Sequence, residues 1–205
     1  MYVFSLVSRY MECPTEMHIL AAKRILCYLQ GTKDFEIFYR KGERADLIGF
    51  TDSDYAGDQD GRKSTSGYVF MLGAGAVLWS SKTQTVVTLL STEAEFVAAT
   101  ACACQVICLR RILKELQFKM ESATMIFCGN NSAIKLSKNP VNHGRSKHID
   151  VTYYFLRDLN NEGTIELQYC RSQDQLADIL TKPLRFLPFQ QLRRSMGIGT
   201  MKEFN

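Results

Sequence analysis

Three acidic residues stand where a predicted strand ends or where a predicted helix lies, and carboxylates in such places can bind metal ions. Asp52 ends a predicted strand over residues 46–52, and Glu95 stands near the start of a long predicted helix over residues 92–117. Asp178 lies in a predicted helix near the end of the chain. Carboxylates that converge at one rim repel one another unless cations neutralise them, and Mg²⁺ prefers oxygen ligands. Two such ions can activate a water molecule and stabilise the leaving oxygen when a phosphodiester is cleaved.

Each of these acids also has a purely structural interpretation. Asp52 precedes a loop, where an aspartate can hydrogen-bond the backbone of a turn. The string Thr92-Glu93-Ala94-Glu95 fits a capping box, in which Glu95 would bond the start of its own helix. Asp178 fits a solvated position on an amphipathic helix. Because short motifs often match by chance, spacing alone permits a metal-dependent phosphoryl site but does not establish one.

The elements that would position these acids follow from hydrophobic periodicity and turn signals. Three consecutive strands form a predicted antiparallel meander, and the later strands alternate with helices, which allows them to run parallel. We therefore predict an α/β fold with a mixed five-stranded sheet, helices on its faces and an N-terminal helical arm. The predicted strands cover residues 35–39, 46–52, 67–72, 76–80, 124–128 and 164–170. The predicted helices run from Cys13-Pro14 to Gly31 and over residues 92–117, 131–138, 149–160 and 174–181.

Length and composition narrow the class of protein. A chain of 205 residues and 23.3 kDa suits one domain, with or without an attached arm. Its 46% hydrophobic and 22% charged residues exclude a disordered or collagen-like chain. No stretch approaches the roughly 20 apolar residues of a membrane helix, so we expect no membrane partner. The seven cysteines have no zinc-site spacing, so we expect thiols without a disulfide partner in a reducing intracellular compartment.

The acidic residues lie within longer strings that can be compared with known families. These strings are Gly49-Phe50-Thr51-Asp52-Ser53-Asp54-Tyr55-Ala56-Gly57-Asp58, Arg62-Lys63-Ser64-Thr65-Ser66-Gly67-Tyr68, Trp79-Ser80-Ser81-Lys82, Leu90-Ser91-Thr92-Glu93-Ala94-Glu95-Phe96, Arg145-Ser146-Lys147-His148-Ile149-Asp150 and Gln175-Leu176-Ala177-Asp178-Ile179-Leu180-Thr181-Lys182-Pro183-Leu184. In this order they resemble the ribonuclease H domain of copia-type retrotransposon Pol polyproteins. The segment from Ser8 to Thr32 resembles the end of the reverse transcriptase region that precedes that domain. We therefore predict a reverse transcriptase remnant over 1–40, a ribonuclease H-like domain over 46–185 and a tail over 186–205.

The resemblance implies both a fold and an activity. It implies the ribonuclease H fold and hydrolysis of the RNA strand of an RNA–DNA hybrid with two Mg²⁺ ions. The catalytic carboxylates of the family fall on Asp52, on Glu95 rather than Glu93, and on Asp178. Asp52 and Glu95 would hold the metals, and Asp178 would place the second ion near the leaving group. The expected partners are RNA–DNA hybrid or RNA, together with the reverse transcriptase portion of the parent polyprotein.

Gly129 departs from the family pattern. After the fourth strand the family has Cys-Asp-Asn-Gln-Ser-Ala, whereas this chain has Cys128-Gly129-Asn130-Asn131-Ser132-Ala133. Glycine stands where the second, metal-bridging aspartate is expected, and it supplies no carboxylate. Loss of a residue that only orients a metal ligand lowers metal affinity or activity roughly 10- to 100-fold, and loss of a direct ligand lowers it further. We therefore predict a much weakened or inactive nuclease.

Three further expectations concern the polymerase site, the length of the reading frame and the C-terminal segment. No Asp-Asp pair occurs, so the polymerase active site of the family is absent. Met1 falls inside what would be the polymerase region, which suggests a fragment of a longer reading frame. Arg193-Arg194, beyond the family strings, suits a surface helix end better than a nucleic-acid contact.

A chain without nuclease activity could still bind nucleic acid or could be a relic with no selected role. Asn130 and Asn131 would reach the sugars of a hybrid, and basic residues would meet its phosphates. The same basic residues also suit an ordinary solvated face. The candidates for phosphate contact are Lys135, Lys138, Arg145, Lys147 and His148.

Overall fold

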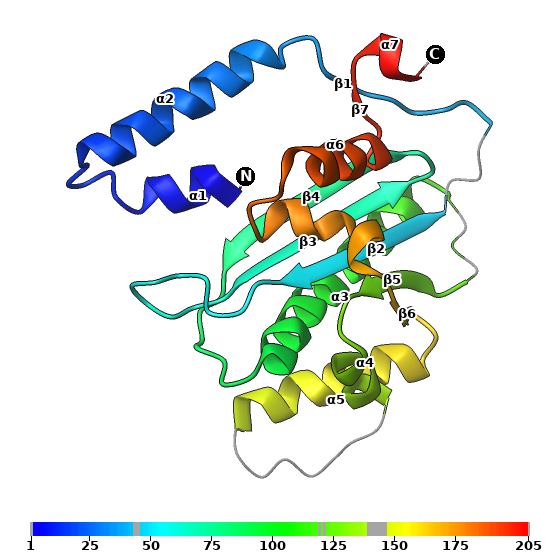
Figure 1. Cartoon of the computed structure of the whole chain (residues 1–205). Helices are drawn as coiled ribbons and strands as arrows, with labels where there is room; N and C mark the ends of the chain where they lie inside the picture. The colour runs from blue at the N-terminus through cyan, green and yellow to red at the C-terminus, as the bar shows by residue number, and fades with distance from the viewer. Residues whose placement is uncertain (1, 43–45, 119, 121, 139–146, 205) are drawn as a thin grey trace.

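The structure is a computed structural model that describes residues 2–42, 46–118, 120, 122–138 and 147–204. Within α5 (Lys147–Asn161), the side chains of residues 147–153 lie outside this description. A five-stranded sheet forms the centre of the molecule, and helices lie on both of its faces (Figure 1).

The strands of the central sheet follow the order β4-β3-β2-β5-β6. They are β2 (Leu47–Ser53), β3 (Thr65–Leu72), β4 (Gly75–Thr83), β5 (Thr124–Cys128) and β6 (Ile165–Tyr169). Antiparallel pairing joins β4, β3 and β2, whereas β5 pairs parallel with β2 and β6 pairs parallel with β5. Parallel neighbours need a crossover, which is supplied first by α3 (Ser91–Glu115) and then by α4 (Asn131–Lys138) with α5. The predicted mixed five-stranded sheet is therefore confirmed.

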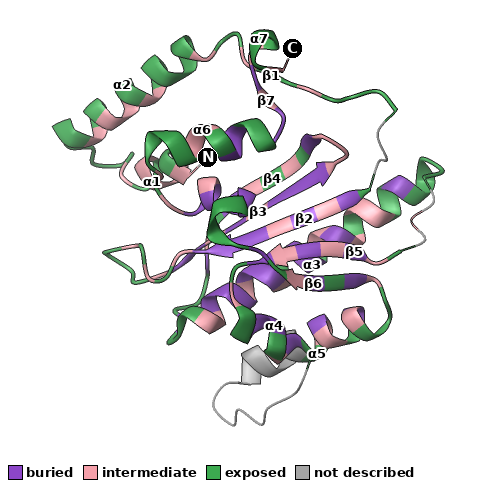
Figure 2. Ribbon diagram, turned by 45° about the vertical axis from the view of Figure 1, so that its right-hand side comes forward, coloured by how far each residue is buried: buried purple, intermediate pink, exposed green. Residues whose placement is uncertain are grey.

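The middle of the sheet is buried on both faces. Phe70 of β3 packs into the larger core with α3, while its neighbours Val69 and Met71 pack into a second core on the opposite face. This alternation is expected for a strand that is covered on both sides. Figure 2 shows the resulting band of buried residues along β2 and β3.

The longest helix, α3, belongs to the larger core. By length and composition alone it could cross a membrane, a property that the sequence analysis did not anticipate. Phe96, Cys102 and Val106 on its inner face are fully buried against the sheet and α5. This packing accounts for the apolar character of the helix.

One predicted helix has a different form. The sequence predicts an α-helix over residues 174–181, but the chain forms two short 3-10 segments there, η1 (Ser172–Asp174) and η2 (Leu176–Leu180). Between them Gln175 has an extended backbone, with φ −79° and ψ 97°. Its side chain is fully buried against the ends of two strands, so the backbone cannot continue as a helix at this point.

The N-terminal arm consists of α1 (Tyr2–Ser8) and α2 (Glu16–Gly31). The sequence predicts that Cys13-Pro14 opens the second helix, but α2 begins after Thr15, whose backbone N–H donates to Nδ1 of His18 over 3.0 Å. Gly31 is the last helical residue and does not follow the helix. The helix therefore begins at a Thr–His cap, not at the proline.

The arm contacts the body mainly through α1 and the residues just after it. Tyr10 donates to Asp60 over 2.6 Å, and Arg9 pairs with Asp58 over 3.1 Å, so the arm is fixed to the loop that follows β2. The structure describes α2 in full, and no residue of it is buried. Two of its leucines, Leu26 and Leu29, are 65% and 57% exposed.

The segment after the family strings folds against the rest of the molecule. It forms α6 (Phe186–Ser195), β7 (Ile198–Gly199) and α7 (Met201–Phe204). β7 pairs antiparallel with β1 (Glu36–Ile37), so the predicted strand over 35–39 is shorter than expected and lies outside the central sheet. Leu192 of α6 is part of the second core.

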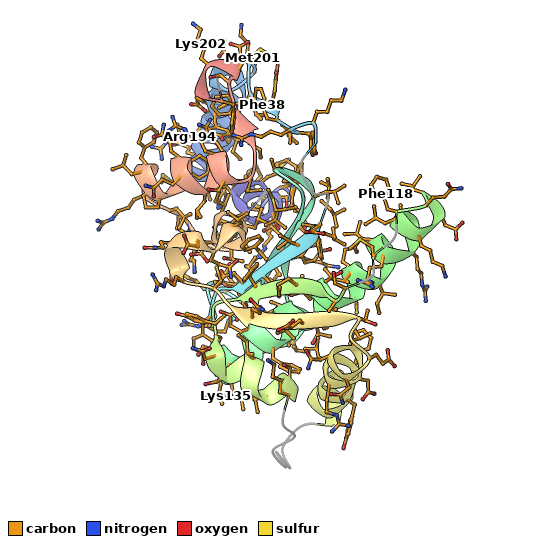
Figure 3. The ribbon with its side chains drawn as sticks, turned by 90° about the vertical axis from the view of Figure 1, so that its right-hand side faces the viewer. Phe38, Phe118, Lys135, Arg194, Met201 and Lys202 are labelled. Atoms are coloured by element: carbon orange, nitrogen blue, oxygen red, sulfur yellow. The ribbon has the colours of Figure 1, made fainter. Side chains whose placement is uncertain are left out.

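The prediction that Arg193-Arg194 form a surface helix end is wrong for Arg193, which is 5% exposed. Its guanidinium lies 2.8 Å from Glu203 and 4.1 Å from the centre of the Phe35 ring. Arg194 remains half-exposed and points away from the body, 3.3 Å from the same glutamate (Figure 3). The partners of Arg193 come from segments far apart in the chain, so the local sequence does not reveal its burial.

Replacing Arg193 should therefore cost far more than replacing its neighbour. Arg193→Ala leaves Glu203 with a weaker partner and removes the stack on Phe35, and we expect a loss of about 3 kcal/mol in the free energy of unfolding. Arg194→Ala breaks an exposed pair and should cost less than about 1 kcal/mol. Urea denaturation of both variants measures the difference, and equal losses would contradict the burial of Arg193.

Candidate active site

Asp52 and Asp178 meet at one end of the central sheet. Asp52 lies near the end of β2, Asp178 lies in η2, and both side chains are buried. The hydroxyl of Thr181 donates to Asp52 Oδ2. Lys182 Nζ lies 3.0 Å from Asp178 Oδ1 and 3.4 Å from Asp52 Oδ2, so one ammonium bridges the two carboxylates. Neither aspartate has the structural role considered above: in the described part of the chain the Asp52 carboxylate contacts the side chains of Thr181 and Lys182, and Asp178 is buried.

Glu95 is the third acid of this group. It lies in the second turn of α3, where it is buried close to the end of β2. Burial, and next the negative charge of Asp52, raise the pKa of Glu95 from 4.5 to about 8, although Lys182 and the backbone N–H of Ser53 partly oppose this. Burial and Asp52 likewise raise the pKa of Asp178 to about 6. The three predicted acids therefore share one low-dielectric site.

The structure separates the roles of Glu93 and Glu95. Oε2 of Glu93 accepts a hydrogen bond from the backbone N–H of Leu89 over 2.8 Å, just before α3 begins. Glu93 thus closes the start of the helix, which is the role that a capping box would give to Glu95. Two positions later, Glu95 is buried, and the charges of both aspartates act on it. The preference for Glu95 over Glu93 as the site residue agrees with this geometry.

Gly129 follows β5, and its neighbour Cys128 is paired with Thr51, the residue before Asp52. Among the described residues, the single atom within 4 Å of a Cβ added at Gly129 is Oε1 of Glu95, at 3.9 Å. A side chain at this position would therefore have room and would point toward the acids. The missing carboxylate leaves the site open on the side of Glu95.

Two residues that the sequence analysis did not assign hold η2 in place. The side-chain amide of Gln175 donates to the backbone oxygens of Thr51 (3.1 Å) and Phe127 (3.4 Å), which ties η2 to β2 and β5. Gly67 is paired with Asp52 across β3 and β2, and a Cβ there would lie 2.7 Å from Thr181 Cγ2. Only a glycine lets η2 approach β3 this closely. Both residues stand in the family strings, but nothing in their local sequence identifies these long-range contacts.

The acids as they stand do not fit a two-metal site. Within the described part of the chain, no three His, Cys, Asp or Glu side chains are grouped so that they could hold a metal ion. Gly129 supplies no ligand, and the Lys182 ammonium lies against the same aspartate oxygens that a metal would need. The predicted Mg²⁺ site therefore lacks a complete donor set here.

Four of the predicted nucleic-acid residues lie in the described part of the chain, at the start of α4 or on it. Oδ1 of Asn130 accepts from the backbone N–H groups of Ser132 (2.9 Å) and Ala133 (3.1 Å), so Asn130 caps α4 and its amide NH₂ would have to make any sugar contact. Asn131, Lys135 and Lys138 are exposed on α4, and Figure 3 shows Lys135 at the end of the molecule opposite Lys202. Arg145 and the side chains of Lys147 and His148 lie outside the described part of the chain.

The raised pKa of Glu95 predicts a dependence of stability on pH. The pKa of Glu95 is about 8 in the folded chain and 4.5 in the unfolded chain, so the folded chain holds the proton more tightly. This contribution to stability is complete below pH 4.5 and is lost as the pH rises through 8. Glu95→Gln stays neutral, so its unfolding free energy should exceed that of the parent by an amount that grows to the order of 3 kcal/mol at pH 9.

Urea denaturation at pH 5 and pH 9 in the presence of EDTA measures this difference. Glu93→Gln is the matched control, because it makes the same change at the exposed start of α3. A constant difference between Glu95→Gln and the parent at both pH values would contradict the assignment of the raised pKa.

Over nearly its whole length the chain is similar to proteins of transposons. It is 42% identical over 199 residues to the retrovirus-related Pol polyprotein from transposon RE2 of Arabidopsis thaliana, a match that covers 96% of this chain and 14% of that protein. It is 38% identical over 197 residues to the corresponding polyprotein from transposon TNT 1-94 of Nicotiana tabacum, covering 96% and 15%. The chain thus spans a small part of the length of these relatives. No family model matched the chain.

The fold has a counterpart among solved structures. The N-terminal ribonuclease H domain of a Mycobacterium tuberculosis protein aligns with a TM-score of 0.50 at 10% identity, covering 74% of this chain and 96% of that one. At this identity the likeness establishes the fold alone. Sequence and fold agree: over nearly its whole length the chain is similar to one part of the Pol polyproteins of transposons, and it has the ribonuclease H fold.

Proposed function

We propose that this chain is a retrotransposon ribonuclease H-like domain that engages RNA–DNA hybrids and whose metal-dependent cleavage of the RNA strand is strongly impaired. Homology to transposon Pol polyproteins and the ribonuclease H fold support the class of substrate. The observation that carries the impairment is the open position at Gly129, which faces Glu95 without a carboxylate.

The charges of the site support the proposal that it attracts divalent cations only weakly. With its pKa near 8, Glu95 is mostly protonated at neutral pH, and a protonated carboxyl is a poor ligand. The charges of Asp52 and Asp178 are partly balanced by Lys182. A carboxylate at position 129 would add negative charge beside Glu95, and Mg²⁺ is the ion that such an oxygen-rich set suits.

Surface features support the proposed partners. Lys135 and Lys138 are exposed on α4, directly after the open end of β5, where they can meet the phosphates of a bound hybrid.

On the N-terminal arm, the exposed Leu26 and Leu29 give α2 an apolar face that suits contact with a preceding reverse transcriptase portion. Binding to hybrid without cleavage is the alternative function, and it would use the same basic residues.

Restoring the carboxylate should restore cleavage. We expect Gly129→Asp to cleave the RNA strand of a labelled RNA–DNA hybrid in Mg²⁺ at least about 100-fold faster than the parent chain, because the added group completes the set of oxygen ligands. The double variant Asp52→Asn/Gly129→Asp, which removes another carboxylate from the same site, should be inactive.

Hybrid binding in EDTA separates the remaining outcomes. A parent chain that binds hybrid in a salt-sensitive manner but does not cut it is a silent binding domain. A parent chain that cuts as fast as Gly129→Asp, while Asp52→Asn does not cut, would show that the loss at Gly129 is compensated and would overturn the proposed impairment. Absence of both binding and cleavage in all folded variants would reject the proposed substrate.

A further inference from the structure

Lys182 is the single basic residue whose ammonium the structure places between Asp52 and Asp178, among the residues that it describes. The aspartate side chains are 5% and 8% exposed, whereas that of Lys182 is 41% exposed. The ammonium therefore covers the solvent side of a buried acidic pair. In this position it contacts Asp52 Oδ2 and Asp178 Oδ1.

We infer that Lys182 is a built-in counter-cation of the carboxylate pair and competes with divalent metal ions for the same oxygens. It partly balances the negative charge of the pair when no metal is bound, and a metal ion can bind these oxygens only when the ammonium swings away. The proposal concerns metal affinity alone, so it holds whether or not the chain cleaves hybrid.

The backbone holds Lys182 in this place. The N–H groups of Thr181 and Lys182 both donate to the carbonyl oxygen of Asp178, over 3.3 Å and 3.2 Å, so residues 178 and 182 lie on the same side of one turn. Gln175 fixes the beginning of that turn to β2 and β5. The lysine stem therefore starts from a rigid segment beside both aspartates, which reduces the entropy lost when the ammonium binds them.

The charges around the pair favour this arrangement. Two buried carboxylates repel each other strongly, because little water screens them. Lysine is charged at neutral pH, and its ammonium lies 3.0 Å from Asp178 Oδ1 and 3.4 Å from Asp52 Oδ2. Its charge also acts on Glu95 and Asp54, the other acids near the pair. A compact ammonium suits this position, since it is a point charge with three donors.

The competition can be measured by titrating the metal-free protein with Mn²⁺ in a calorimeter, with no nucleic acid present. Lys182→Met keeps most of the side-chain length but removes the charge, and we expect it to bind Mn²⁺ at least about 10-fold more tightly than the parent. Lys182→Arg keeps the charge and should bind as weakly as the parent. Lys202→Met makes the same charge change on exposed α7, far from the pair, and should have no effect.

Thermal unfolding in EDTA gives a second test of the same variants. Lys182→Met should melt at a lower temperature than the parent, because the aspartates are left unbalanced, and Mn²⁺ should raise its melting temperature more than that of the parent. If Lys182→Met does not fold without metal, Lys182→Gln replaces it, since an amide can still donate to the aspartates. Unchanged Mn²⁺ affinity in the folded neutral variants, or equally tight binding by Lys182→Arg, would overturn the inference. Either result is independent of whether Gly129→Asp restores cleavage.

Discussion

The close approach of Asp52 and Asp178 at the end of the sheet is the constraint on which the rest of this region depends. Two buried carboxylates side by side are stable only if hydrogen bonds and opposite charge replace the water that they have lost. Thr181 and Lys182 supply both, and both residues follow η2 directly. The turn must therefore dock against β2 in one register, because any other would leave a buried carboxylate without a partner.

The fold meets this constraint with a rigid frame. Gln175 joins η2 to two strands, and Gly67 removes the side chain that would keep η2 away from β3. On the other face of the sheet, α3 packs through a large apolar core and brings Glu95 to the same end. This frame does not depend on position 129, where the structure leaves open space. A loss of the carboxylate there changes the chemistry of the site without disturbing its architecture.

Local sequence patterns predict the sheet well. Period-2 alternation indicates which strand residues face the core, and the short connection after β3 indicates that β3 and β4 pair antiparallel. Spacing alone only permits Asp52, Glu95 and Asp178 to converge, and their assignment to one site comes from the family resemblance. Local patterns do not predict the break at Gln175, the burial of Arg193 or the position of Lys182. Each of these depends on partners distant in the chain, which are two strand carbonyls for Gln175, the Phe35 ring for Arg193 and Asp52 for Lys182. Burial and pairing of this kind arise only when the chain is folded.

The central claim is that this chain presents an acidic site whose own lysine and missing carboxylate keep divalent ions out. Its most direct test is anomalous diffraction from crystals of the parent and of Gly129→Asp, both soaked in the same millimolar concentration of Mn²⁺. The account predicts an Mn²⁺ peak between Asp52 and Glu95 in the variant, and in the parent no peak there and Lys182 still bridging Asp52 and Asp178. A peak of equal height beside Asp52 in the parent, with Lys182 displaced, would contradict it.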